Sequence, residues 1–303
     1  MKIGITSAAA GGSESLDGLV EAARSAEAQG FPSFWTPNIF GLEAISALAI
    51  AARETQRIEL GTAVVPTYPR HPFAMAQQAL TAAAAAGGRF TLGIGLSHKI
   101  VIEDMFGLSY EHPARHMREY LEVLTPLLRG EPAKFEGEEY RVNASLAVAG
   151  AGTVPLVVAA LGPVMLGLAG RFADGTITWM TGTRTLETHI GPVIRAAAQK
   201  AGRPEPRVIA GLPVTLTNDV EAAREKMDQT YAIYGTLPSY RAMLDREGVG
   251  GPGGVALLGD ESALREQIRG LEAAGVTDFQ AAPTEIEPGS SQRTVEFLAS
   301  LQA

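Results

Sequence analysis

The chain of 303 residues contains no cysteine. This excludes disulfide bonds, thiolate nucleophiles and cysteine-ligated metals. Its five histidines form no H-E-x-x-H or H-x-H pair, so we expect no metal site. No apolar run is long and unbroken enough to span a bilayer. Residues 1–13 read as a first strand rather than a signal peptide. We therefore expect a cytoplasmic protein that does not bind membranes.

The net charge is −8 and lysine and arginine form no run, which argues against nucleic acid as a partner. An anionic ligand must therefore be held by local groups. Residues 248–253 fit G-x-G-x-x-G, but they follow a helix and Pro252 removes a donor N–H, so we interpret them as a loop, with a lid over the site as one role. Gly95–Lys99 fails as a serine nucleophile elbow, because lysine replaces the second glycine.

Apolar and β-branched runs predict eight strands separated by helical segments. A closed (β/α)8 TIM barrel, an α/β fold, accounts for this number better than an open sheet. No linker divides the chain, so residues 1–303 form one domain, with an inserted hairpin near 135–142 and a glycine-rich loop near 248–254. Functional residues then belong where the strands end. The expected strands are 2–6, 33–36, 58–65, 89–95, 154–160, 176–180, 207–216 and 276–282.

Residues 154–182 read as strand, short loop, helix and strand. Gly162 permits a tight turn, and Pro163 suits the first position of a helix. Backbone N–H groups at such a turn can hold an anion. The alternative is a plain crossover in which the glycine only makes the turn, and the stretch alone leaves both interpretations open.

Four stretches together resemble the luciferase-like flavin and deazaflavin oxidoreductases, which are (β/α)8 barrels. They are GFPSFWTPNIF at 30–40, LGTAVVPTYPRHP at 60–72, GRFTLGIGLS at 88–97, and the AALGP and AGRFADG segments within 154–182. Their order and spacing cover nearly the whole chain. The chain is most similar to the branches that use coenzyme F420, a deazaflavin.

The resemblance implies a bulge after the third strand, with a non-proline cis peptide between Ala63 and Val64 against which the flat ring rests. It also implies a phosphate-binding turn at 161–164, with further donors at 181–182. The residues that it assigns to the cofactor are Asn38, Ala63, Val64, Gly95, Ser97, His98, Leu161, Gly162, Pro163, Val164, Thr181 and Gly182.

The chain departs from the sugar-phosphate dehydrogenases that it resembles. Asn38 stands where they carry aspartate, and Ile39 stands where they carry the catalytic histidine. Asn38 can still hydrogen-bond the ring, but Ile39 cannot take a proton from an alcohol. His98 is then the best acid–base candidate, although a purely structural His98 is the alternative. We therefore take Asn38 and His98 as the catalytic candidates and favour a reductase.

Three functions are compatible with this pattern. The first is F420-dependent hydride transfer to or from a small organic substrate, the second an FMN-dependent monooxygenase, and the third a non-catalytic cofactor-binding subunit. By analogy with the family we expect a homodimer. Trp35, Phe40, Tyr68 and Met180 are each either a pocket wall or a core residue, and for Phe40 the core is favoured. Lys99, Arg70 and Arg184 either meet the acidic cofactor tail or are surface charges.

Overall fold

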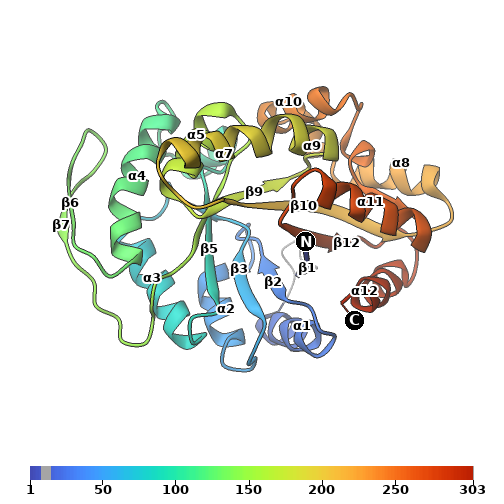
Figure 1. The fold of residues 1–303 in the computed structure, drawn as a ribbon, viewed down its shortest axis with the longest axis horizontal. Coiled ribbons are helices and arrows are strands. Elements are labelled where there is room, and N and C mark those ends of the chain that lie inside the picture. Colours follow the sequence, from blue (N-terminus) through green and yellow to red (C-terminus); the bar gives the residue numbers. More distant parts are fainter. Residues whose placement is uncertain (8–14, 303) are drawn as a thin grey trace.

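The computed structural model describes residues 1–7 and 15–302, and its strands alternate with helices along the chain (Figure 1). Eight parallel strands form a ring, which closes where β9 pairs with β10 and β12 pairs with β1. The predicted (β/α)8 barrel is therefore confirmed. The ring consists of β1 (Lys2–Thr6), β2 (Ser33–Thr36), β3 (Glu59–Thr62), β5 (Phe90–Gly95), β8 (Leu156–Ala159), β9 (Gly175–Trp179), β10 (Arg207–Leu216) and β12 (Asp278–Pro283).

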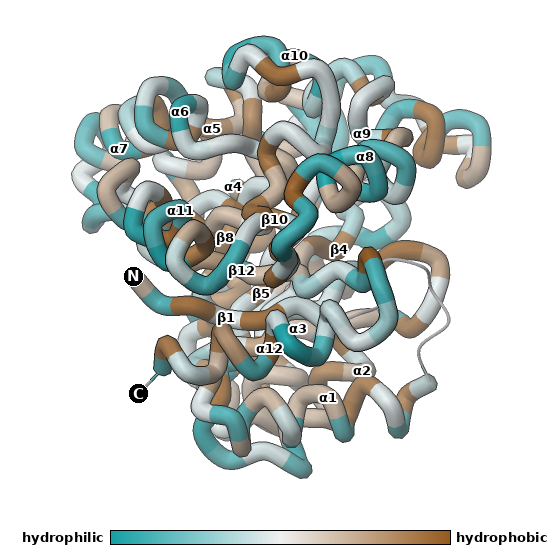
Figure 2. Tube along the Cα trace, turned by 90° about the vertical axis from the view of Figure 1, so that its right-hand side faces the viewer, coloured by the Kyte–Doolittle hydropathy of each residue, from teal (hydrophilic) through white to brown (hydrophobic). Residues whose placement is uncertain are grey.

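Helices surround this ring with their hydrophilic sides outward (Figure 2). Their ends carry the expected signals: the Ser15 side chain caps the first helix, and Gly30 leaves it with φ +85°. The main helices are α1 (Leu16–Ala28), α2 (Ala44–Ala51), α3 (Pro72–Ala85), α4 (Pro113–Leu128), α5 (Pro163–Phe172), α7 (Gly191–Lys200), α8 (Val220–Thr230), α10 (Pro238–Glu247), α11 (Glu261–Ala273) and α12 (Ser290–Ser300).

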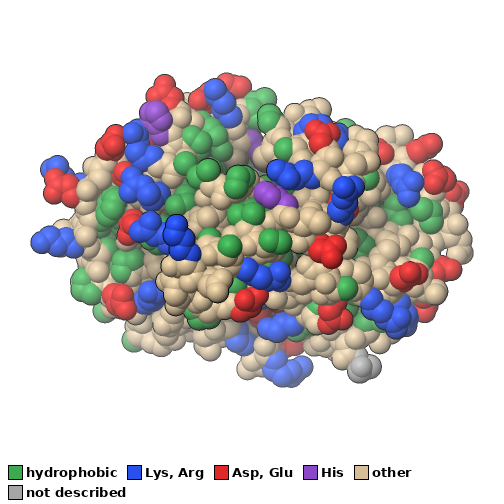
Figure 3. Space-filling model, turned by 45° about the horizontal axis from the view of Figure 1, so that its top comes forward, with side chains coloured by type: hydrophobic (Ala, Val, Ile, Leu, Met, Phe, Trp, Pro, Cys, Tyr) green, Lys and Arg blue, Asp and Glu red, His purple; other side chains and the backbone are tan. Residues whose placement is uncertain are grey.

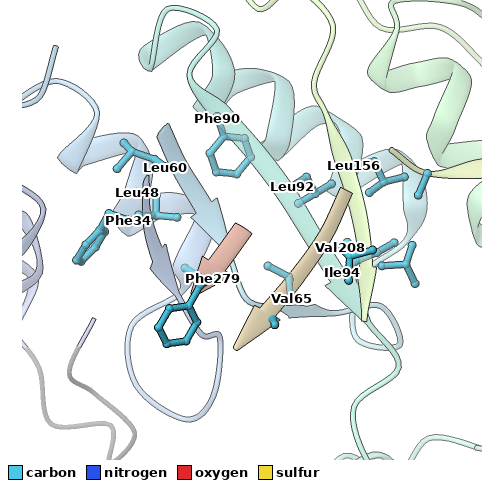
Figure 4. Close-up of a cluster of buried hydrophobic side chains, with 14 of the residues drawn as sticks. Phe34, Leu48, Leu60, Val65, Phe90, Leu92, Ile94, Leu156, Val208 and Phe279 are labelled. Atoms are coloured by element: carbon cyan, nitrogen blue, oxygen red, sulfur yellow. The ribbon is translucent and has the colours of Figure 1, made fainter. Parts of the chain in front are cut away.

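The largest core lies between the outer face of the ring and the helices. Phe34, Leu60, Phe90, Leu92 and Phe279 are almost fully buried there (Figure 4). Because a strand turns alternate side chains to opposite faces, the intervening positions point into the barrel. Both faces are thus covered, which explains why these strands have little polar alternation in the sequence.

The lowest layer inside the barrel is ionic. The Arg207 guanidinium lies 2.7 Å from Glu59 Oε1 and 2.7 Å from Asp278 Oδ1. Hydrogen bonds to these two carboxylates raise the pKa of Arg207, although burial opposes them. Thr91 donates to Glu59 as well. These charges come from the first residues of the strands, so they lie at the amino-terminal end of the barrel.

A fully buried Trp35 fills the middle layer. Its side chain packs with Val157, Ile177 and Ile209, and its ring occupies the space that a side chain on Gly61 would need. Trp35 Nε1 donates to Ser33 Oγ at 3.0 Å. Trp35 is therefore a plug in the middle of the barrel rather than an open pocket wall.

Several local features differ from the prediction. The third strand is not continuous over 58–65 but breaks after Thr62 and resumes as β4 (Val65–Pro66). Two short elements were not predicted: the π-helical turn η1 (Val101–Met105) and the strand β11 (Leu257–Gly259). The inserted hairpin is confirmed as β6 (Ala133–Glu136) and β7 (Arg141–Ala144), which project at the left of Figure 1.

Two further segments refine the prediction. Near residue 191, where a kink was expected, the π-helical turn η2 (Leu186–Ile190) follows the short α6 (Thr183–Thr185) and ends at the start of α7. The glycine-rich loop contains a 3-10 turn, η3 (Pro252–Gly254), and Asp228 accepts from Gly253 N. Among the described residues, no helix is long and apolar enough to cross a lipid bilayer.

Candidate active site

The carboxyl-terminal mouth of the barrel is built mostly from small side chains. Strand alternation brings one residue of each neighbouring strand inward above Trp35. On one side these residues are glycine or alanine, which leaves a low floor. Only Trp179 and Gln280 are large. The inward residues of this upper layer are Thr6, Ala63, Gly95, Ala159, Trp179, Gly211 and Gln280.

The floor centres on a cis peptide bond between Ala63 and Val64, as the resemblance implied. Both of these half-buried side chains pack on the Trp35 cluster from above, together with Ala159. A Cβ on Gly95 would lie 2.8 Å from Val64 Cγ2 and 3.1 Å from Ala159 Cβ. Val64 thus occupies the space that Gly95 leaves free. That a flat ring rests on this floor stays a prediction.

The amino terminus of α5 borders the same mouth. Gly162 is its N-cap and contributes no side-chain hydrogen bond, and a Cβ there would meet nothing within 4 Å. The first N–H groups of a helix have no partner within it, so they are available to an anion. His189 Nε2 lies 2.8 Å from the Leu161 carbonyl oxygen and fixes this turn from η2. Pro163 and Val164 are exposed beside it.

A carboxylate of the chain itself competes with a phosphate at residues 181–182, the second predicted phosphate contact. Thr181 and Gly182 are buried, and the Thr181 hydroxyl donates to the Trp179 carbonyl at 3.3 Å. The Glu247 carboxylate packs against Gly182 and accepts from Thr185 N at 2.8 Å and from Arg184 N at 3.1 Å. A carboxylate therefore already binds the N–H groups at the start of α6. The role of residues 181–182 stays a prediction.

Asn38 lies on the loop after β2. Its Oδ1 accepts from Ala44 N at 3.1 Å, so its amide group supports the start of α2 while the residue is half-buried. Ile39 is 43% exposed and Phe40 is 63% exposed. The expectation of a core Phe40 is therefore wrong, because this loop carries it out to the surface. Met180 is fully buried and is not an open wall.

His98 follows β5 and faces an aromatic side chain from α10. Its ring centroid lies 5.7 Å from that of Tyr240. Burial lowers the pKa of His98 below its ordinary value of 6.5, so the imidazole is mainly neutral at pH 7. Ser97 before it has φ +62° and its carbonyl accepts from the Tyr110 hydroxyl at 3.4 Å. This geometry is compatible with an acid–base role for His98, and that role stays a prediction.

The sequence interpretation missed a wall of packed aromatic side chains at the mouth. Trp179 makes an edge contact with Tyr231 at 5.8 Å, and Tyr234 of the short helix α9 (Ala232–Thr236) makes one with Tyr240 at 5.0 Å. The Tyr231 hydroxyl lies 3.0 Å from Thr284 Oγ1. A signal was present, because three of the seven tyrosines in the chain lie within residues 231–240.

The basic candidates for the acidic tail have other partners or stand in solvent. Arg70 Nη2 lies 3.2 Å from Glu43 Oε1, and Lys99 Nζ lies 3.5 Å from Glu103 Oε2. Arg184 is exposed. Acidic and basic side chains are interspersed over the face shown in Figure 3, without a continuous patch of one sign. Contact of these residues with a cofactor tail stays a prediction.

The fold and this mouth can be set beside known proteins. The family model described as luciferase-like monooxygenase matches residues 1–278. The chain belongs to that family. It is 30% identical over 249 residues to 5,10-methylenetetrahydromethanopterin reductase of Methanolobus tindarius, a match that covers 80% of this chain and 76% of that one. The family prediction is confirmed.

Further relatives carry related names. An F420-dependent glucose-6-phosphate dehydrogenase of Nakamurella multipartita is 33% identical over 226 residues, covering 72% of this chain and 64% of the relative. The solved coenzyme F420-dependent tetrahydromethanopterin reductase of Methanopyrus kandleri aligns with TM-score 0.81 at 24% identity, covering 98% and 97% of the two chains. A Pseudomonas putida monooxygenase in complex with FMN aligns with TM-score 0.77 at 18% identity, covering 99% and 96%. These two structural likenesses concern the fold alone.

Proposed function

We propose that this luciferase-like protein is a coenzyme F420-dependent oxidoreductase that transfers a hydride between a bound deazaflavin and a small organic substrate, in the reductive direction. The observation that carries the proposal is the mouth itself, where a floor of small residues lies beside an open helix amino terminus. The name of the Nakamurella relative, an F420-dependent dehydrogenase, supports the choice of cofactor.

The residues present fit such a group. The side of the mouth formed by Ala63, Gly95 and Ala159 suits a flat ring, because none of these side chains is larger than a methyl group and Val64 already fills the space beside Gly95. The unpaired N–H groups beyond Gly162 suit a phosphate, and no side chain caps them. When bound, a deazaflavin supplies a two-electron hydride and reacts poorly with oxygen.

The chain's own residues then have separable tasks. Val64 and Ala63 support the ring, and the turn at 161–164 holds the phosphate. The wall formed by Trp179, Tyr231, Tyr234 and Tyr240 restricts water on the substrate side. His98 is the candidate to hold or supply the proton that accompanies the hydride when a C=C or C=N bond is reduced.

The reductive direction rests on what is missing near the mouth. Oxidation of an alcohol needs a base to take the hydroxyl proton. Ile39 has no such group, and Asn38 is occupied in holding the start of α2. His98, mainly neutral at pH 7, is the remaining candidate to exchange a proton in either direction, so the reductive direction rests on the absence of a histidine at position 39, where the sugar-phosphate dehydrogenases carry their catalytic one.

An FMN-dependent monooxygenase is the second candidate, since the fold also occurs in the FMN-bound enzyme named above, and FMN has the same flat ring and phosphate. A non-catalytic cofactor-binding subunit is the third candidate, because Ile39 stands where the sugar-phosphate dehydrogenases carry their catalytic histidine. That subunit would bind cofactor and turn over no activated alkene, imine or alcohol.

Titration of the apoprotein with F420 and with FMN tests the proposal, with ligand fluorescence as the readout. We expect micromolar or tighter binding of F420. Binding of FMN alone would overturn the proposal. Gly162→Asp should weaken F420 binding, because it places a carboxylate at the phosphate turn, whereas Gln199→Asp is a control that adds a carboxylate at an exposed position of α7. Equal binding by both variants would refute a phosphate at α5.

We also propose a homodimer that forms through α2 and α3. Neither helix carries a charged residue, and a shallow hollow between them is lined by Ile45, Ala49, Gln78 and Thr81. Ile50 beside it is 45% exposed. Light scattering should give a dimer for the wild type and a monomer for Thr81→Arg, and a wild-type monomer would refute the proposal. The cytoplasmic location stays a prediction.

A further inference from the structure

We infer that Gln280, together with Thr6, determines substrate specificity by hydrogen-bonding a neutral polar edge, so that the protein takes uncharged amide-like or lactam substrates rather than anionic ones. The inference rests on the proposed function, since it concerns the substrate side of the same mouth. It adds a substrate class and a residue that the sequence interpretation did not consider.

Gln280 lies in the upper layer of the barrel, on β12. It is 4% exposed, and its Nε2 donates to Thr6 Oγ1 of the neighbouring strand at 2.7 Å. A Cβ on Gly211 would lie 3.2 Å from Gln280 Oε1 and 3.0 Å from Trp179 Cε3. Gln280 and Trp179 therefore flank the gap left by a glycine, on the strands that follow β8 of the small-residue floor around the ring.

The Gln280 amide has unused hydrogen-bonding capacity. A glutamine amide offers two N–H donors and one carbonyl acceptor. Among the described residues only one donor is used, in the bond to Thr6. The Gln280 Oε1 accepts no hydrogen bond from the described residues and is not among their fully enclosed unpaired polar atoms, so it is open to a ligand, and a ligand that supplies both an acceptor and a donor gains here. A lactam presents C=O and N–H side by side and matches that pattern.

The charge distribution in the barrel excludes anions from the same place. Among the described residues, the inward strand positions beyond Trp35 hold no Asp, Glu, Lys or Arg. The cation Arg207 lies below the Trp35 plug and is already paired with two carboxylates. A carboxylate or phosphate on the substrate would thus be desolvated without a partner, which is expensive.

The test uses three small probes with reduced F420: 5,6-dihydro-2-pyridone, which is an unsaturated lactam, 2-cyclohexenone, which has only the acceptor, and crotonate, which is anionic. Oxidation of the cofactor is followed by absorbance, and binding of each probe to the F420 complex is measured by calorimetry. We expect the lactam to bind best and crotonate worst. Gln280→Leu should raise the KM and the dissociation constant for the lactam by roughly tenfold or more.

The control variants distinguish failure of the proposed function from failure of the substrate inference. Gln280→Leu should leave the F420 dissociation constant within about twofold, and the exposed Gln199→Leu should change nothing. Thr6→Val should reproduce part of the Gln280 effect. Failure of the wild type to bind F420 would sink the proposed function. Normal F420 binding with equal use of crotonate, with no lactam binding, or with an unchanged lactam KM in Gln280→Leu would sink this inference alone.

Discussion

Gly95→Ala should destabilise the protein, and Val64→Ala in the same chain should rescue it. The new Cβ would lie 2.8 Å from Val64 Cγ2 and 3.1 Å from Ala159 Cβ, both closer than ordinary van der Waals contact. Valine is stiff at χ1, so it cannot rotate away freely. Overpacking of this kind costs about 1–3 kcal/mol.

The second change works in the opposite direction. Val64→Ala alone removes two methyl groups from a half-buried side chain, at a cost of roughly 1–2 kcal/mol. In the double variant the Cβ introduced at position 95 fills part of the space that the valine methyl groups vacated. The losses of unfolding free energy in the two single variants should therefore add up to at least about 1 kcal/mol more than the loss in the double variant. Such a difference is the coupling expected of residues in contact.

Urea unfolding of the wild type, both single variants and the double variant measures this coupling, provided that the slope with denaturant is unchanged. Gly167→Ala is the matched control, because its Cβ meets nothing within 4 Å in the middle of α5. It should stabilise the protein by about 0.5–1 kcal/mol. Additive penalties at positions 64 and 95 would show that Val64 does not occupy the space above Gly95.

Three further results are expected. Burial lowers the pKa of His116 to about 4. As the pH falls below 6.5, the unfolded state therefore binds a proton at this residue before the folded state does. Between pH 7 and pH 4.5 the unfolding free energy of the wild type should fall by about 2–3 kcal/mol more than that of His116→Gln. Glu247→Gln should speed amide hydrogen exchange at Arg184 and Thr185, whose N–H groups donate to the Glu247 carboxylate. Unchanged exchange would show that the carboxylate does not hold these N–H groups. His98→Asn should lower turnover by about 100-fold, whereas normal turnover would make His98 structural.

The barrel could be predicted because its signals are local. Apolar strands buried on both faces, caps such as Ser15 and a glycine such as Gly30 act within a few residues. The break between Ala63 and Val64 was reached through the resemblance rather than through the pattern, since Ile58–Val65 reads as one continuous strand. Its reason is visible only in three dimensions, where Val64 joins Ala63 on the interior face.

Other features depend on contacts between distant residues. Gln280 looks like an ordinary polar residue of its strand until β1 places Thr6 beside it. Nothing near Gly182 in the sequence announces Glu247, which arrives from the end of α10. Phe40 has the composition of a core residue, yet its loop is exposed. The strand β11 is only three residues long, too short for a periodic signal.

The position of Trp35 links stability and chemistry in this barrel. Below it, the Arg207 cluster joins the first residues of β3, β10 and β12, so changes there should affect the free energy of unfolding rather than the substrate. Above it, the inward strand positions of the described residues carry no charged side chain, and we propose that specificity there depends on hydrogen bonds and shape. A barrel divided in this way can change its substrate by replacing Thr6 or Gln280 while the ionic layer stays intact. Function in this chain should therefore be carried by the ends of the strands, and we propose that the resemblance to sugar-phosphate dehydrogenases does not extend to the chemistry of the substrate.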